Sequence, residues 1–239
     1  MACLLLVLVI AGFGSEFLRR SSAELSALPA HLHVHGVVLL AWFLCFVLQP
    51  LLIATGEPSA HRRFGVVAAS LGLGCISAGP LATLGAVRSL TQRGLEWESS
   101  LTAYPALGIE SLTMGQYATF LVCGNFASIA CFAVLLLAAI VRRRDAGSHK
   151  RLMLLASMSL MAPAIARLAR WPIFGGEDGV LIPLGMLCLF LSLALHDWRL
   201  MRRLHAATLW GSLFVALTMG AGLLFATTPF AARLVQGLA

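Results

Sequence analysis

Charged residues are scarce in this sequence. Asp, Glu, Lys and Arg make up 11% of its 239 residues, against about a quarter in soluble domains, and 59% of the residues are hydrophobic. No hydrophilic stretch is long enough to form a separate soluble domain. The composition therefore excludes an ordinary soluble protein and predicts an integral membrane protein that forms a single domain over residues 1–239.

The motifs of conventional enzymes are also missing. The chain holds no Walker, Rossmann or nucleophile-elbow motif, and its apolar segments contain no paired carboxylates. The six cysteines form no CxxC pair, which indicates small core residues rather than disulfides or metal ligands. These absences argue against a conventional nucleotide-dependent or hydrolytic enzyme, and they leave open whether the protein is an enzyme at all.

Long uncharged runs are what the sequence has instead. Crossing a bilayer core of ~30 Å takes about 20 helical residues. Six runs approach or exceed that length, at residues 36–52, 64–87, 111–141, 152–166, 179–195 and 206–232. Residues 1–15 form a shorter seventh run. We therefore expect an all-α polytopic transmembrane bundle of about seven helices, four of them kinked by Pro50, Pro80, Pro163 and Pro183.

The basic residues gather in alternate loops. Segments 55–63, 142–151 and 196–205 hold ten basic and three acidic residues, which accounts for the whole formal net charge of +7. The positive-inside rule then predicts that these loops are cytoplasmic, with the N-terminus inside and the C-terminus outside, in a bacterial inner (plasma) membrane. Attraction to an anionic inner leaflet explains the basic balance, so no nucleic-acid partner is expected.

One longer loop, residues 88–110, is predicted on the opposite side. It carries Trp97 and Tyr104, aromatic residues that anchor segments at a membrane interface. We expect it to form an amphipathic or re-entrant piece.

Three histidines recur at one position in the predicted hairpins. His61, His149 and His205 each stand where a basic loop turns into the next apolar helix. Imidazole is the commonest metal ligand and also binds haem iron. One interpretation is therefore that these three side chains converge to bind haem or a transition metal. The alternative is that they are hydrogen-bonded interfacial residues.

Neighbouring residues suit a haem in particular. The helical stripe that follows His61 carries Gly65, Ala68 and Gly72, which would leave room for a macrocycle. Arg62, Arg63 or Arg151 could pair with its propionates.

A second group of histidines begins the helix predicted after Pro29. His31 and His35 are spaced i, i+4 and could share one metal ion, whereas His33 would point elsewhere. The site could consist of histidines alone or include a carboxylate from Glu96, Glu98 or Glu110. Trp42 and Gln49 continue the stripe of His35 at spacings of seven, so all three are expected to face the bundle interior. The alternative for the histidines is a polar helix cap beside an acidic loop.

The first hairpin carries the pattern His35-Gly36, Trp42, Gln49 and His61-Arg62-Arg63-Phe64-Gly65. In this it resembles bacterial multipass membrane proteins of unknown function, and segments 149–153 and 205–211 resemble the same group. The resemblance spans most of the chain and implies a membrane protein. It does not indicate an activity. Histidines at helix ends also give a looser likeness to b561-type cytochromes. Those place paired histidines on facing helices at both levels, whereas here one helix supplies all the outer histidines.

Three functions follow as hypotheses. The first is a redox or cofactor-handling membrane protein that binds haem or a transition metal. The second is a non-catalytic structural or assembly subunit that partners other membrane subunits. The third is a small transporter or proton-coupled channel that uses the stripe of His35, Trp42 and Gln49.

Overall fold

The structure is a computed structural model that describes residues 1–19, 21, 28–92, 96–104, 109–174 and 178–238. The elements in chain order are α1 (Ala2–Arg19), α3 (Ala30–Ala54), α4 (Pro58–Gln92), β1 (Ser100–Tyr104), β2 (Ile109–Thr113), α5 (Met114–Val141), α6 (Ala146–Ser159), α7 (Ala162–Ala169), the 3-10 turn η2 (Pro172–Phe174), α8 (Asp178–Met201), α9 (Ala206–Ala226) and α10 (Pro229–Gln236).

Five of these helices are long and apolar enough to cross a membrane: α3, α4, α5, α8 and α9. The pair α6 and α7 counts as a sixth candidate if it is taken as one span bent by 46°, and the apolar part of α1 is shorter. The predicted helical architecture is therefore confirmed, and these five helices have the length and composition of a multipass membrane protein. Of the two remaining runs predicted as spans, one is broken and one is short.

Two corrections concern the predicted all-α fold and its long loop. Helix α4 continues to Gln92, and β1 pairs with β2 in an antiparallel hairpin instead of forming an amphipathic or re-entrant piece. The half-buried indole of Trp97 packs directly against Gly115 in the first turn of α5. The side chain of Tyr104 lies outside the described part of the chain. The segment is thus held by strand pairing and by a contact with the bundle.

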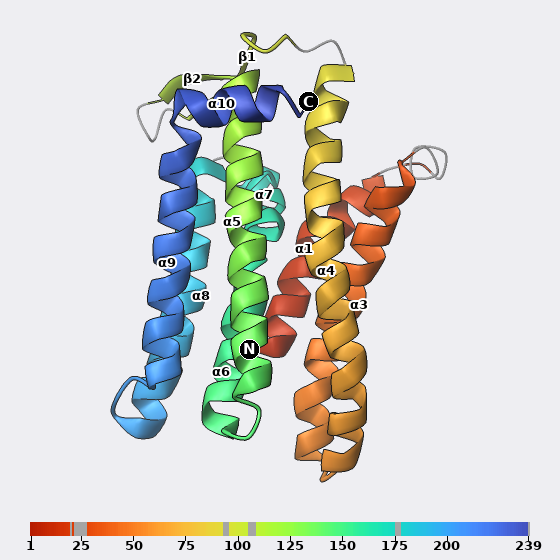
Figure 1. Cartoon of the computed structure of the whole chain (residues 1–239), viewed down its shortest axis with the longest axis vertical. Helices are drawn as coiled ribbons and strands as arrows, with labels where there is room; N and C mark the ends of the chain where they lie inside the picture. The colour runs from red at the N-terminus through yellow and green to blue at the C-terminus, as the bar shows by residue number, and fades with distance from the viewer. Residues whose placement is uncertain (20, 22–27, 93–95, 105–108, 175–177, 239) are drawn as a thin grey trace.

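The bundle has two different ends (Figure 1). The turns α3–α4, α5–α6 and α8–α9 lie together at one end, which we call the basic end and define by residues 55–57, 142–145 and 202–205. The β-hairpin and the short helix α10 lie at the other, the hairpin end. The three loops predicted to share one side of the membrane therefore lie at one end of the bundle.

An aromatic cluster joins the α3–α4 hairpin to the other helices. Trp42 is 1% exposed, and its ring meets that of Phe132 edge-on with centroids 5.0 Å apart. Its indole N–H donates to the Ser157 hydroxyl over 3.3 Å. A Cβ at Gly72 would clash with Leu136, so glycine is what allows α4 to approach α5 here. This contact sets the position of α3 and α4 relative to α5 and α6.

A buried ion pair joins α6 to α8. The Arg151 guanidinium donates to Asp197 at 2.8 Å through Nε and at 2.5 Å through Nη2, and the two residues are 4% and 0% exposed. Thr208 of α9 donates to the same carboxylate at 2.5 Å. The network therefore ties α6, α8 and α9 together at the basic end.

Removing one partner of this pair should be costly. Asp197→Ala leaves the Arg151 charge buried without compensation, for which we expect a loss of about 3–5 kcal/mol in the free energy of unfolding. Thermal or denaturant unfolding of the purified protein in detergent measures it. The double variant Arg151→Met/Asp197→Leu, which removes both charges, should recover most of the loss. If the double variant were as unstable as the single one, the charge pairing would not be the cause.

Candidate functional site

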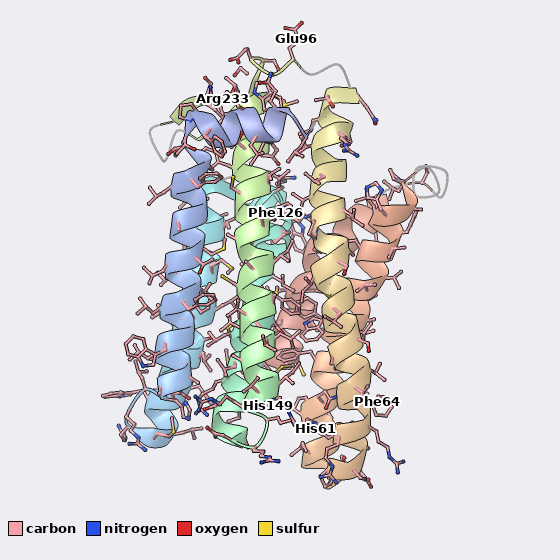
Figure 2. The ribbon with its side chains drawn as sticks, in the orientation of Figure 1. His61, Phe64, Glu96, Phe126, His149 and Arg233 are labelled. Carbon is pink, nitrogen blue, oxygen red and sulfur yellow. The ribbon has the colours of Figure 1, made fainter. Side chains whose placement is uncertain are left out.

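Two of the three predicted histidines come together at the basic end. His61 lies in the first turn of α4 and His149 in the first turn of α6, and both are half-buried. Their ring centroids are 6.4 Å apart and the ring planes are perpendicular. Figure 2 shows the two side chains between the α3–α4 hairpin and the α5–α6 hairpin. The pair is thus assembled from two separate helical hairpins.

Each ring is held by a backbone carbonyl of the preceding helix. The Nδ1 of His61 lies 3.3 Å from the Gln49 oxygen, and the Nδ1 of His149 lies 2.8 Å from the Ala139 oxygen. Ala139 is in the last turn of α5, where carbonyls lack partners within the helix, so His149 satisfies one of them. The same arrangement in both hairpins explains why each histidine follows its loop at the same position.

These contacts assign the tautomer of both rings. A carbonyl oxygen can only accept a hydrogen bond, so each Nδ1 must carry the proton. In the neutral imidazole the Nε2 lone pair is then available. Within the described part of the chain neither His61 nor His149 makes a second hydrogen bond through its ring. An Nδ1–H held by a backbone carbonyl is the usual arrangement for a histidine that binds metal through Nε2.

The separation of the rings can be compared with that of two imidazoles on one metal ion. Metal–nitrogen bonds are about 2.0 Å, and an imidazole nitrogen lies about 1.1 Å from the ring centre, given ring bonds of about 1.33 Å. Two imidazoles on opposite sides of one ion therefore have centroids about 6.3 Å apart. The observed 6.4 Å between His61 and His149 matches this value.

His205 has a different role from the other two. Its Nδ1 accepts a hydrogen bond from the Ala207 N–H at 3.1 Å, so His205 is the N-cap residue of α9. The backbone N–H of His205 donates to the Asp197 carboxylate. In the neutral ring the proton is therefore on Nε2, opposite to His61 and His149. The ring packs beside Gly147 at the start of α6. The expected convergence of three histidines is thus not formed, and no group of three His, Cys, Asp or Glu residues that could hold a metal ion occurs among the described residues.

Two of the predicted arginines also differ from each other. Arg151 forms a buried ion pair with Asp197, and its predicted pairing with a haem propionate stays a prediction. Arg62 is exposed beside His61 and has no ion pair within the described residues. The α5–α6 turn contributes one acidic group, Asp145, where the Ser148 hydroxyl and neighbouring backbone N–H groups lower the pKa of the carboxyl.

The surroundings of the pair include an open space and an amide without a partner. A Cβ at Gly65, one turn after His61, would meet no atom within 4 Å. At Gly72, by contrast, Trp42 and Leu136 fill the space, so of these two glycines only Gly65 has open space beside it. The backbone carbonyl of Gln49 holds His61. The side-chain amide of the same residue is buried and has no protein partner within the described part.

The second histidine group lies at the opposite end of α3. His31 and His35 are half-buried and His33 is exposed, as the helical spacing predicts. The His31 ring packs against Gly85, while His35 faces a small cavity. Glu96 and Glu98 are exposed, and the side chain of Glu110 lies outside the described residues. The described residues therefore give this pair no third ligand for a metal ion.

The capping role of His205 can be tested by substitution. His205→Ala removes the acceptor for the Ala207 N–H and should lower the free energy of unfolding by about 1 kcal/mol, whereas His205→Asn keeps a capping oxygen and should lose less. Thermal unfolding in detergent compares them. If both variants lost the same free energy of unfolding, the loss would have a cause other than the missing helix cap.

No family model matches this chain, and no curated protein and no solved structure matches it either. The resemblance of the first hairpin to bacterial multipass proteins therefore stays a hypothesis. Support for a function comes from the geometry of the site.

Proposed function

We propose that this protein is a membrane haem protein in which His61 and His149 are the two axial ligands of one haem. The single observation that carries the proposal is the pair itself. Its ring centroids are 6.4 Å apart, close to the separation of two imidazoles on opposite sides of one ion, and each Nδ1 is held by a backbone carbonyl that leaves Nε2 available.

The number of ligands favours haem over a bare transition metal. A structural zinc ion takes four protein ligands and a catalytic one usually three. Haem iron already has four ring nitrogens and needs only two from the protein. Among the described residues no third His, Cys, Asp or Glu joins His61 and His149 in a group that could hold a metal ion, so the donor set fits haem.

Other residues fit the same cofactor. The open space at Gly65 lies beside His61, and the unpartnered Gln49 amide offers a hydrogen bond on the same side of the bundle. Exposed Arg62 is available for a propionate at the membrane surface. When bound, such a haem supplies a one-electron redox centre. We therefore propose that the protein acts in redox chemistry or in cofactor handling.

For the topology we propose seven membrane segments, counting α1 and the bent pair α6–α7. The basic end is then cytoplasmic and the C-terminus outside, in a bacterial inner membrane. The support is the positive charge that the loops of the basic end share, together with the neutral balance of the rest of the chain.

An absorption spectrum tests the haem proposal. The detergent-purified protein, produced with added haem precursor, should show a Soret band and, after reduction with dithionite, the sharp α and β bands of bis-histidine haem. His61→Ala and His149→Ala should each abolish the six-coordinate spectrum, because each removes one axial ligand. The controls are His196→Ala, an exposed histidine at the same end, and His205→Asn. The proposal is wrong if the wild type binds no haem, or if the controls lose it equally.

Accessibility labelling tests the topology. In a variant without the six native cysteines, a single cysteine at Arg143 should react with a membrane-impermeant maleimide only after the inner membrane is opened. A cysteine at Glu98 should react in intact spheroplasts. Both positions are exposed, so reactivity reports the side of the membrane. Labelling of Glu98→Cys only after opening would reverse the orientation.

A further inference from the structure

A second polar site lies deeper in the bundle, away from the histidine pair. A cavity of about 60 Å³ opens between α3, α4, α5 and the junction of α6 with α7. The polar and reactive residues among its lining are His35, Cys75, Thr83, Asn125 and Ser128, with Pro163 at the helix break. Trp42 and Phe132, one turn further toward the basic end on α3 and α5, are buried and in contact. This aromatic contact separates the cavity from His61 and His149.

The cavity coincides with a break in the membrane-spanning backbone. Helix α6 ends at Ser159 and α7 begins at Ala162, with a bend of 46° between them. The predicted kink at Pro163 is therefore a full interruption of the helix. Ser128 of α5 donates a hydrogen bond to the Ser159 carbonyl across this break. Irregular backbone at membrane depth is tolerated where it is buried in protein or lines a water-filled cavity.

Two side chains at the cavity lack a protein partner within the described part of the chain. The Nδ1 of His35 is buried and makes no hydrogen bond. The Asn125 amide on α5 lines the same cavity without a side-chain hydrogen bond to the described residues, although its atoms are only partly buried. Polar groups without partners are expensive in an apolar environment. Their position on one small cavity indicates a shared polar occupant.

The size and charge of the cavity restrict that occupant. A volume of about 60 Å³ has room for a few water molecules, each of which needs at least about 10–15 Å³, and is far too small for a macrocycle. No carboxylate of the described residues lines the cavity, so a metal cation would find no compensating charge from them. The lining does provide the several hydrogen-bonding groups that a buried water needs: His35, Asn125 and the hydroxyls of Thr83 and Ser128.

We propose that this cavity is a water-binding site in which His35 and Asn125 anchor bound water at the break between α6 and α7. The bound water satisfies both side chains and hydrates the interrupted backbone. The site does not depend on haem binding at His61 and His149, because it involves none of the same residues.

Hydroxyl-radical footprinting tests for water at this site. An X-ray pulse converts bound water into hydroxyl radicals, and these radicals oxidise the side chains beside that water. Cys75 lines the cavity, and Cys131 on α5 is a matched control; they are free thiols, 4% and 0% exposed. We expect Cys75 to be oxidised several-fold faster than Cys131 in the purified wild-type protein. Equal rates, or a faster rate at Cys131, would mean that the cavity is dry.

Two variants test the anchoring residues. Asn125→Leu and His35→Phe each replace an anchor with an apolar side chain that occupies the cavity, and either should bring oxidation of Cys75 down to the rate of Cys131, which should not change. His61→Ala should leave the rate at Cys75 as in the wild type even if haem is lost. Should one variant fail to fold, the other decides. Undiminished oxidation of Cys75 in a folded variant would overturn the assignment of that residue.

Discussion

The ion pair between Arg151 and Asp197 is the interaction on which the basic end depends. Charges in an apolar bundle must pair, because leaving either one alone in that environment is prohibitively costly. Here the pairing fixes the start of α6 against α8, and Thr208 extends the contact to α9. His149 stands two residues before Arg151 on the same helix. The position of one proposed haem ligand is therefore set by a charge pair that has no chemical part in the site.

The other ligand is positioned by packing. His61 belongs to the α3–α4 hairpin, which meets the rest of the bundle through Trp42, Phe132 and the glycine at position 72. The site thus forms where a hairpin positioned by aromatic contacts meets a helix positioned by an ion pair. Substitutions far from either histidine, in the aromatic cluster or at Asp197, change the distance between the rings without touching them.

Sequence patterns predicted the helices well, because uncharged runs and helical spacing depend on local composition alone. They also placed His31, His33 and His35 correctly by exposure. They did not separate His205 from His61 and His149, since all three follow a basic loop. The difference lies in the tertiary structure. The turn that begins at Arg202, which has a positive φ of 54°, brings the backbone N–H of His205 to the Asp197 carboxylate. The imidazole ring of His205 then caps the start of α9. The sequence did indicate an ion pair for Asp197, because an acidic residue beside a membrane segment requires a basic partner.

The interior stripe of α3 serves two separate sites. His35 lines the cavity at the α6–α7 break, the carbonyl of Gln49 holds His61, and Trp42 lies between them, packed against Phe132 and bonded to Ser157. A transport route along this stripe would have to pass the indole, which is 1% exposed. In this conformation the stripe is closed at its centre. The closure favours a cofactor site at one end of the bundle over a small transporter that uses the same three residues.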